Sequence, residues 1–279
     1  MLTLADLYTA LGQPITIPNA GAIHIREVVI DSRQVKLGDL FVALPGEAVD
    51  GHRFVADAVR RGAIAALVQQ EVTDVNATPD ALPVLIRVNN TLAALQQIAA
   101  WWRDQFNVRV IGVTGSIGKT TTKEMLGSIL SRIAPTLVTR GNLNNDLGVP
   151  VMLLELRPEH QYAVMELGAS HQGEIDYTSN LVQPQVAGII NIGTAHLGEF
   201  GGREGICRAK SEIYAHILPE GISVVPADDD FTVTIRENAQ THSILSFGHG
   251  GDVFATEVEL HPQSAKFNLS SLLNTLFYH

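Results

Sequence analysis

Two alternating patterns of hydrophobic residues along the chain predict an α/β fold. Short apolar runs are typical of buried strands, and apolar residues three and four positions apart are typical of amphipathic helices. In the first part of the chain the predicted strands are 27–30, 40–44, 65–68 and 84–88. Residues 53–61 have helical spacing, and a longer helix is predicted over 91–106.

From residue 108 onward, apolar runs and helical stretches follow one another. The predicted strands are 108–113, 136–139, 163–167, 186–192, 222–225 and 243–247. This alternation predicts a mostly parallel sheet with helices on both faces. Ligands of such sheets bind beyond the carboxyl ends of the strands. Polar residues that follow the strands are therefore the candidate site residues.

These patterns divide the chain into domains. A small N-terminal α/β domain is predicted over 1–85, a connecting helix over 86–107 and a central domain with the mostly parallel sheet over 108–279. The length of 279 residues suits one large or two ordinary domains.

The segment after the strand 108–113 has the features of a phosphate-binding loop. Its residues are Thr114, Gly115, Ser116, Ile117, Gly118, Lys119, Thr120 and Thr121. Loop amides and the N-terminus of a helix predicted over 119–133 point at an anion, while Lys119 neutralises phosphate charge and Thr120 reaches a magnesium ion. Val113 stands where a strict Walker A motif has glycine. The alternative is a glycine-rich connection without a ligand, which leaves Lys119 at the helix end that disfavours positive charge.

Two further candidates follow predicted strands at the same sheet edge. Glu166 lies near the end of the strand 163–167 and suits magnesium, either directly or through water. The alternative is an acid exposed to solvent. His196 follows the strand 186–192 across a turn. Loop histidines are more often structural, but the position of His196 favours a metal or phosphate role.

Lys210 lies on the apolar stripe of a predicted helix over 204–218, four residues after Ile206. Most lysines on such stripes extend their amine to water. A lysine held near a buried site instead has its pKa lowered by desolvation. Its neutral amine is then able to react with carbon dioxide, which gives an anionic carbamate that binds metal. The sequence permits both interpretations.

The segment 140–150, the asparagine loop, holds Asn142, Asn144, Asn145 and Asp146 within five positions. Asparagine-rich loops also serve as turns and caps. Ligand contact is the favoured interpretation here, because the loop joins a predicted strand to a helix at the candidate edge.

Composition restricts the partners and the location. The net charge is -10, and basic residues form no cluster larger than a pair, so nucleic acid is an unlikely partner. No apolar stretch approaches the ~20 residues of a membrane span. The single cysteine and the absence of a signal peptide favour the cytoplasm.

Taken together, these segments resemble the Mur ligase family of peptidoglycan synthesis. The resemblance rests on the segments 114–125, 141–150, 165–170, 191–200 and 208–213. In the first domain, 31–33 and 38–44 look like the family segment that receives the UDP-sugar. The stretch 252–269 resembles a strand pair of the family's central domain.

The resemblance implies ATP-driven amide formation. ATP would phosphorylate the terminal carboxylate of UDP-N-acetylmuramoyl-tripeptide, and the amine of D-alanyl-D-alanine would attack the acyl phosphate. The implied catalytic residues are Lys119, Lys210 and His196. One magnesium ion would be held by Thr120 and Glu166, and a second by His196 and carbamylated Lys210. Substrate contacts are expected from Asn142, Asn144, Asn145, Ser32 and Arg33.

The chain departs from the family pattern after residue 270. The family's C-terminal domain is absent from the sequence, so a truncated chain with weak nucleotide binding and little ligase turnover is expected. Two alternatives stay open. One is a folylpolyglutamate-type ligase, which has a similar loop and lysine. The other is a fragment that binds a nucleotide or UDP-sugar without turnover.

Overall fold

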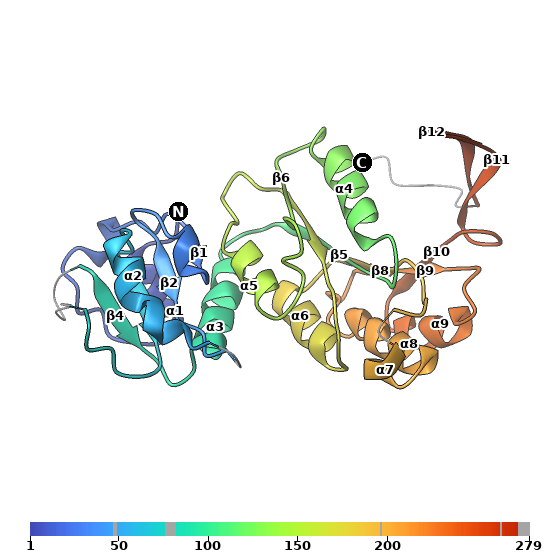
Figure 1. Ribbon diagram of the computed structural model, residues 1–279. Coiled ribbons are helices and arrows are strands. Elements are labelled where there is room, and N and C mark those ends of the chain that lie inside the picture. The colour runs from blue at the N-terminus through green and yellow to red at the C-terminus, as the bar shows by residue number, and fades with distance from the viewer. Residues whose placement is uncertain (47–48, 76–81, 196, 263, 273–279) are drawn as a thin grey trace. The chain divides into compact units, whose positions relative to one another are not determined.

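The computed structural model describes residues 1–46, 49–75, 82–195, 197–262 and 264–272. It divides into two compact units, each with its own parallel sheet (Figure 1). The first unit comprises Met1–Asn107 and Pro150–Glu159, and the second comprises Val108–Val149 and His160–His279. The prediction of an α/β fold built on parallel sheets is confirmed.

The first unit contains a four-stranded sheet of order β1-β2-β3-β4, with every pair parallel. Its elements are α1 (Leu4–Ala10), β1 (Val28–Val29), β2 (Leu40–Val42), α2 (Val55–Arg60), β3 (Ala65–Val68), β4 (Val84–Arg87) and α3 (Thr91–Arg103), with 3-10 turns η1 (Ala20–Ala22), η2 (Ser32–Gln34) and η3 (Gly51–Phe54). Every residue of β2 and β3 is buried. Continuous apolar runs are what a parallel sheet covered on both faces requires.

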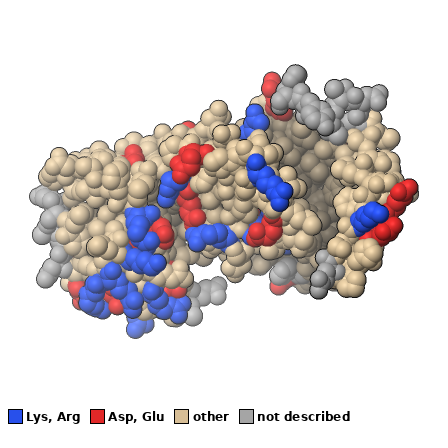
Figure 2. Space-filling view, turned by 90° about the horizontal axis from the view of Figure 1, so that it is seen from above, with Lys and Arg blue, Asp and Glu red and all other residues tan. Residues whose placement is uncertain are grey.

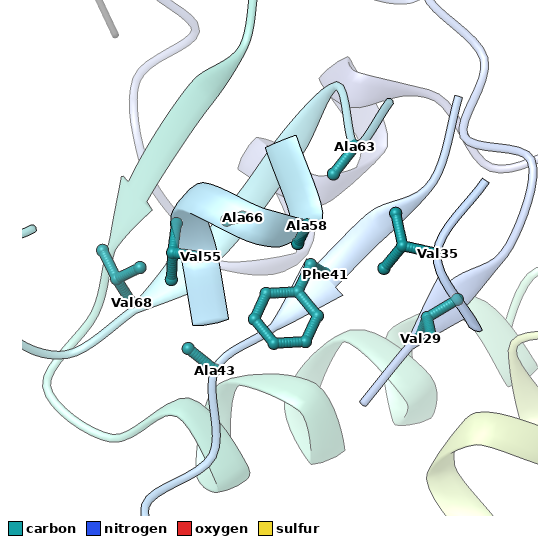
Figure 3. Packing of buried hydrophobic residues seen from close by; sticks show 9 residues of the cluster. All are labelled: Val29, Val35, Phe41, Ala43, Val55, Ala58, Ala63, Ala66 and Val68. Carbon is teal, nitrogen blue, oxygen red and sulfur yellow. The ribbon is translucent and has the colours of Figure 1, made fainter. Parts of the chain in front are cut away.

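One side of this sheet packs against α2 around the ring of Phe41 (Figure 3). Phe41 is 1% exposed and lies among small residues, chiefly alanines and valines of β3 and α2. Because strand side chains alternate between faces, Leu40 and Val42 point to the opposite side. Small neighbours leave room for one large ring, so Phe41 fills most of the volume at the centre of this layer.

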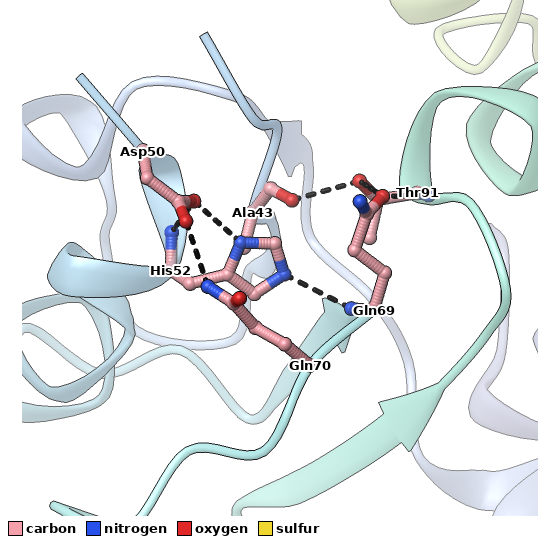
Figure 4. A network of polar contacts seen from close by, with 6 residues as sticks. All are labelled: Ala43, Asp50, His52, Gln69, Gln70 and Thr91. Atoms are coloured by element: carbon pink, nitrogen blue, oxygen red, sulfur yellow. Dashed lines mark hydrogen bonds and ion pairs between the residues drawn. The ribbon is translucent and has the colours of Figure 1, made fainter.

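Polar side chains tie together the carboxyl ends of β2 and β3 and the start of α3 (Figure 4). The buried imidazole of His52 lies 2.6 Å from Asp50 through Nδ1 and accepts the N–H of Gln69 at Nε2, at 2.9 Å. The Oε1 of Gln69 accepts the N–H of Thr91, whose hydroxyl donates to the carbonyl of Ala43. Since Nε2 is an acceptor, His52 is the neutral tautomer with its proton on Nδ1.

The second unit contains an eight-stranded sheet of order β12-β11-β10-β9-β8-β5-β7-β6. Its strands are β5 (Arg109–Thr114), β6 (Thr136–Val138), β7 (Tyr162–Glu166), β8 (Val186–Ile189), β9 (Ile222–Pro226), β10 (Ser243–Phe247), β11 (Val253–His261) and β12 (Ser264–Ser271). All pairs are parallel except β11 with β12.

Helices cover both faces of this sheet. They are α4 (Lys119–Leu130), α6 (Glu174–Val182), α7 (Leu197–Phe200), α8 (Arg203–Ser211) and α9 (Thr232–Ala239), with the 3-10 turn η4 (Glu212–Tyr214). The helix α4 packs on β5, β6 and β7 from one side, whereas α6, α8 and α9 lie on the other (Figure 1). The short helix α5 (Gly148–Leu153) begins in the second unit and ends in the first.

The hairpin of β11 and β12 forms the edge of the sheet and exposes apolar side chains, among them Leu260 (81%) and Leu269 (70%). Its pairing register shifts between Thr256 and Glu259. Elsewhere much of the surface charge is paired, as in the 2.8 Å ion pair of Arg61 with Asp57. Figure 2 shows basic and acidic side chains next to one another on the first unit, at the left of the view. None of the described helices is long and apolar enough to cross a bilayer.

Several predicted elements are longer than the observed ones, and two of them show why. The helix predicted over 119–133 ends at Leu130. The strand predicted over 186–192 ends at Ile189, because Asn191 turns towards the loop after β5. Apolar residues continue past both ends, so the hydrophobic pattern alone could not locate them.

We expect Phe41→Ala to lower the free energy of unfolding of the first unit by about 3–5 kcal/mol, because it leaves a cavity among small neighbours. Urea denaturation followed by tryptophan fluorescence measures this, since both tryptophans lie in α3. Leu37→Ala is the matched control at a side chain that is 79% exposed, and it should change stability by less than about 0.5 kcal/mol. A loss below about 1 kcal/mol for Phe41→Ala would contradict this account of the core.

Candidate active site

The loops that follow β5, β6 and β7 meet at the carboxyl edge of the second sheet. β5 lies between β7 and β8. The chain leaves β5 for β6 and β7 on one side of it and then crosses to β8 and β9 on the other side, so the strand order reverses at β5. Such switch points are where ligands of parallel sheets bind. A cavity of about 310 Å³ opens there. Its polar lining residues are Ser116, Lys119, Asn142, Asn144, Asn145, Asp146, Ser170, Glu174 and Lys210.

The predicted phosphate loop has a defined shape that Asn191 holds. The backbone carbonyl of Asn191 accepts the N–H of Ser116 at 3.1 Å, and its side chain both accepts from and donates to the backbone of Ile117 at 3.0 Å. Gly118 has φ +85°, a conformation that few residues other than glycine adopt, and it starts α4. These contacts direct the start of α4 at the cavity.

The first turn of α4 is available to an anion. The backbone N–H groups of Lys119, Thr120 and Thr121 have no intrahelical acceptor, and the helix has no side-chain cap. The Lys119 amine bonds to the carbonyl of Gly115 at 2.9 Å and lines the cavity. Unpaired donors, a helix dipole and a cation together suit the phosphates of a nucleotide.

Glu166 is buried, with only 2% exposure, so the interpretation of a solvent-exposed acid is wrong. The hydroxyl of Thr120 donates to its Oε2 at 3.1 Å, and the amide of Asn144 donates to its Oε1 at 2.7 Å. A hydroxyl and a carboxylate side by side provide the hard oxygen ligands that magnesium prefers. Bound magnesium usually keeps several water molecules and phosphate oxygens as its other ligands. Within the described ranges no group of three or more His, Cys, Asp or Glu residues forms a metal cluster.

Lys210 points into the site from α8. It is 5% exposed, so the interpretation in which its amine extends to water is wrong. Burial, together with the charge of Lys119, lowers the pKa of Lys210 to about 8. Among the residues that the structure describes, none forms a hydrogen bond or ion pair with the side chain of Lys210.

Some residues of the asparagine loop bond to other parts of the protein, and others line the cavity. Asn144 holds Glu166, and a Cβ on Gly168 would come within 3.0 Å of the Asn144 Oδ1. Asn145 accepts the N–H of Gly148 at 2.9 Å, close to the start of α5. Asn142 is exposed and lines the cavity.

The remaining predicted site residues are Ser32, Arg33 and His196. Ser32 and Arg33 belong to the first unit. Ser32 is buried, whereas the Arg33 side chain is 83% exposed and pairs with Asp31 at 2.7 Å. This pairing lowers the pKa of Asp31. His196 lies outside the described residues.

Three residues near the cavity were not among the predicted site residues. Asn191 holds the phosphate loop. Lys123 is 1% exposed and donates to the backbone carbonyl of Thr139, whose hydroxyl accepts the N–H of Glu166 at 3.0 Å. Glu174 accepts the N–H of Ser170 at 2.8 Å and lines the cavity. Lys123 follows Lys119 by four positions, the spacing of one helix face, and this was the available signal.

We expect Lys210→Met to raise the free energy of unfolding at pH 7 by as much as about 3 kcal/mol. Below about pH 8 both folded and unfolded chains carry the Lys210 charge, and its burial destabilises the fold. Between about 8 and the ordinary value of 10.5 only the folded chain releases the proton, so wild-type stability should rise with pH. Urea denaturation by circular dichroism in bicarbonate-free buffer measures both effects.

Lys266→Met is the matched control, because the Lys266 side chain is 79% exposed. It should leave stability and its pH dependence unchanged. If Lys210→Met kept the wild-type rise between pH 8 and 10.5, the lowered pKa of Lys210 would not be its source.

Comparison with known proteins agrees with this geometry. The Mur ligase middle domain matches residues 113–277, and the catalytic domain of the Mur ligase family matches residues 24–103. Curated relatives named UDP-N-acetylmuramoyl-tripeptide–D-alanyl-D-alanine ligase include those of Haemophilus influenzae and Escherichia coli. Each is 40% identical over 89% of this chain and 54% of its own length. The chain thus spans about half the length of these relatives.

Solved structures give the same result. MurF from Acinetobacter baumannii has a TM-score of 0.86 at 59% identity, over 97% of this chain and 58% of that chain. MurF ligase from Thermotoga maritima, solved in complex with ADP, has a TM-score of 0.77 at 33% identity, over 88% of this chain and 56% of that chain. Since the middle-domain match alone covers more than half of its residues, this chain belongs to the Mur ligase family.

Proposed function

We propose that this chain provides the ATP site and the UDP-sugar site of a ligase that joins D-alanyl-D-alanine to UDP-N-acetylmuramoyl-tripeptide. The observation that carries the proposal is the single cavity that brings together the phosphate loop, the asparagine loop and Lys210. The printed names of the curated relatives and the ADP bound to the Thermotoga maritima ligase support the choice of substrates.

The proposed mechanism is phosphoryl transfer to a carboxylate, followed by attack of an amine. Charge neutralisation and positioning carry most of the catalysis in such reactions. The loop amides from 114 to 121 and the Lys119 amine bind the ATP phosphates. Thr120 and Glu166 hold a magnesium ion, which supplies positive charge at the phosphates. The hydrogen bond from Asn144 keeps the Glu166 carboxylate directed at Thr120.

The proposed role of Lys210 is to form a carbamate. With its pKa lowered to about 8, roughly a tenth of the amine is neutral at pH 7, and the neutral fraction rises with pH. Its nitrogen attacks the carbon of carbon dioxide and releases a proton to water, which leaves an anionic carbamate. Together with His196, the carbamate would hold a second magnesium ion. After addition of ¹³C-bicarbonate, a carbamate NMR resonance that Lys210→Met lacks is the expected sign of this modification.

Substrate contacts complete the proposal. Asn142, Asn144 and Asn145 line the cavity, which supports their proposed contact with the peptidyl substrate. Ser32 and the exposed guanidinium of Arg33 are proposed to lie near the uridine diphosphate, because an arginine fork suits a diphosphate.

We expect Lys119→Ala to weaken the binding of magnesium-ADP by about 10- to 100-fold, since a hydrogen bond from a charged donor is lost. Isothermal titration calorimetry measures the dissociation constants. Lys36→Ala, which removes an exposed lysine of the first unit, is the matched control and should bind like the wild type. Equal affinity of Lys119→Ala and wild type would exclude this loop as the phosphate site.

The choice of substrate has its own test. The chain should bind UDP-N-acetylmuramoyl-tripeptide saturably and should not bind dihydropteroate, the substrate class of a folylpolyglutamate-type ligase. Arg33→Ala should weaken the first interaction about tenfold while ADP binding is preserved. Binding of dihydropteroate instead would favour the second enzyme class. Phosphate release that requires both peptidoglycan substrates would exclude a binding fragment without turnover.

A further inference from the structure

The cavity at the carboxyl edge carries charges of both signs. Lys119 and Lys210 contribute cations, whereas Asp146 and Glu174 contribute carboxylates. Such a lining is complementary to a ligand that has both an anionic and a cationic end. The roles proposed above, phosphate binding for Lys119 and carbamate formation for Lys210, account for both lysines, but they give the carboxylates nothing to bind.

Two of these four charges are already used within the protein. The amine of Lys119 bonds to the carbonyl of Gly115 at 2.9 Å. Glu174 accepts the N–H of Ser170 at 2.8 Å and lies 3.1 Å from the Nδ1 of His171. Burial raises the pKa of Glu174, but these contacts together outweigh it and the pKa is lowered. Glu174 therefore shapes the turn before α6, and its charge is largely compensated.

The other two charges have no such compensation. No residue within the described ranges forms a hydrogen bond or ion pair with the side chain of Asp146 or Lys210. Lys210 is 95% buried, and Asp146 is half-buried. They are carried by different elements, the asparagine loop and α8, and no ion pair within the described residues joins them. Burial of an unpaired charge lowers the free energy of unfolding unless a group of opposite charge binds beside it.

A third group lies beside Asp146. The hydroxyl oxygen of Tyr177, on α6, is buried and has no hydrogen-bond partner within the described part of the chain. Burial and then the negative charge of Asp146 raise the pKa of Tyr177, so the hydroxyl stays protonated and lies within the field of that carboxylate. A neutral hydroxyl and a carboxylate together suit a primary ammonium group, which donates three hydrogen bonds.

We propose that Asp146, supported by Tyr177, binds a primary ammonium group of the substrate in the cavity that the phosphate loop also lines. This inference rests on the proposed function. In that reaction an ammonium group is carried by D-alanyl-D-alanine, and it is also carried by a basic third residue of the tripeptide. Asp146 is thus a specificity-determining residue that orients the substrate against the phosphate end.

The test compares Asp146→Asn with the wild type for ligands with and without the ammonium group. The probes are D-alanyl-D-alanine and its N-acetyl form, and UDP-N-acetylmuramoyl-tripeptide with lysine as third residue and its Nε-acetyl form. Asp146→Asn should weaken binding of one or both ammonium ligands about tenfold in titration calorimetry. The acetylated forms should bind wild type and variant equally. The ligand that loses affinity identifies which ammonium group Asp146 holds.

Asp176→Asn is the matched control. It removes a neighbouring carboxylate on α6 that pairs with His216 and does not line the cavity. It should bind every probe like the wild type. Magnesium-ADP binding should be unchanged in both variants. If Asp146→Asn loses ADP binding as well, Asp146→Glu restores the charge, and recovery of ammonium binding by this variant supports the proposal.

The outcomes separate the two proposals. If Asp146→Asn binds every ammonium ligand as tightly as the wild type does, this inference alone is overturned. Loss of ammonium binding in both Asp146→Asn and Asp146→Glu would overturn it as well, because charge would not be the determinant. If the wild type binds ADP but neither ammonium ligand, the proposed substrates fail, and the role of Asp146 fails with them.

Discussion

The site depends on one buried carboxylate. Glu166 accepts hydrogen bonds from Thr120 at the start of α4 and from Asn144 in the asparagine loop, while its own N–H is held by Thr139 at the end of β6. A charge that is 98% buried needs such donors to be tolerated. Their directions fix three loops relative to one another before any ligand arrives. The same oxygens suit a magnesium ion, which would replace hydrogen-bond donors without moving the backbone.

The sequence predicted the sheets and the edge where the site lies. Fully apolar runs such as 65–68 are specific to strands buried on both faces, and the observed β3 has those bounds. The phosphate loop was predictable because its chemistry is local: glycines, lysine and threonine lie within eight positions. The end of β8 was not predictable, because Asn191 leaves the strand and forms a hydrogen bond with the phosphate loop, 74 residues away in the sequence.

The burial of the charged residues could not be predicted from the sequence either. Whether Glu166 faces solvent depends on Asn144, which is 22 residues distant, and the burial of Lys210 depends on how α8 packs. Charges without partners cost stability wherever they occur. Their presence around the cavity, and not in the core of the first unit, fits the common pattern in which functional sites are less stable than the scaffold that holds them.

The edge hairpin of the second sheet has a consequence for behaviour at high concentration. Among the strands that the structure describes, β12 has a neighbour on one side only, so its outer N–H and C=O groups form a template to which the strand of another molecule is able to add. Apolar side chains such as Leu269 would strengthen that contact. The bulge between Thr256 and Glu259 and the charge of Lys266 interrupt the flat surface that such stacking requires. Colloidal stability of this chain is therefore set by a few residues far from its site.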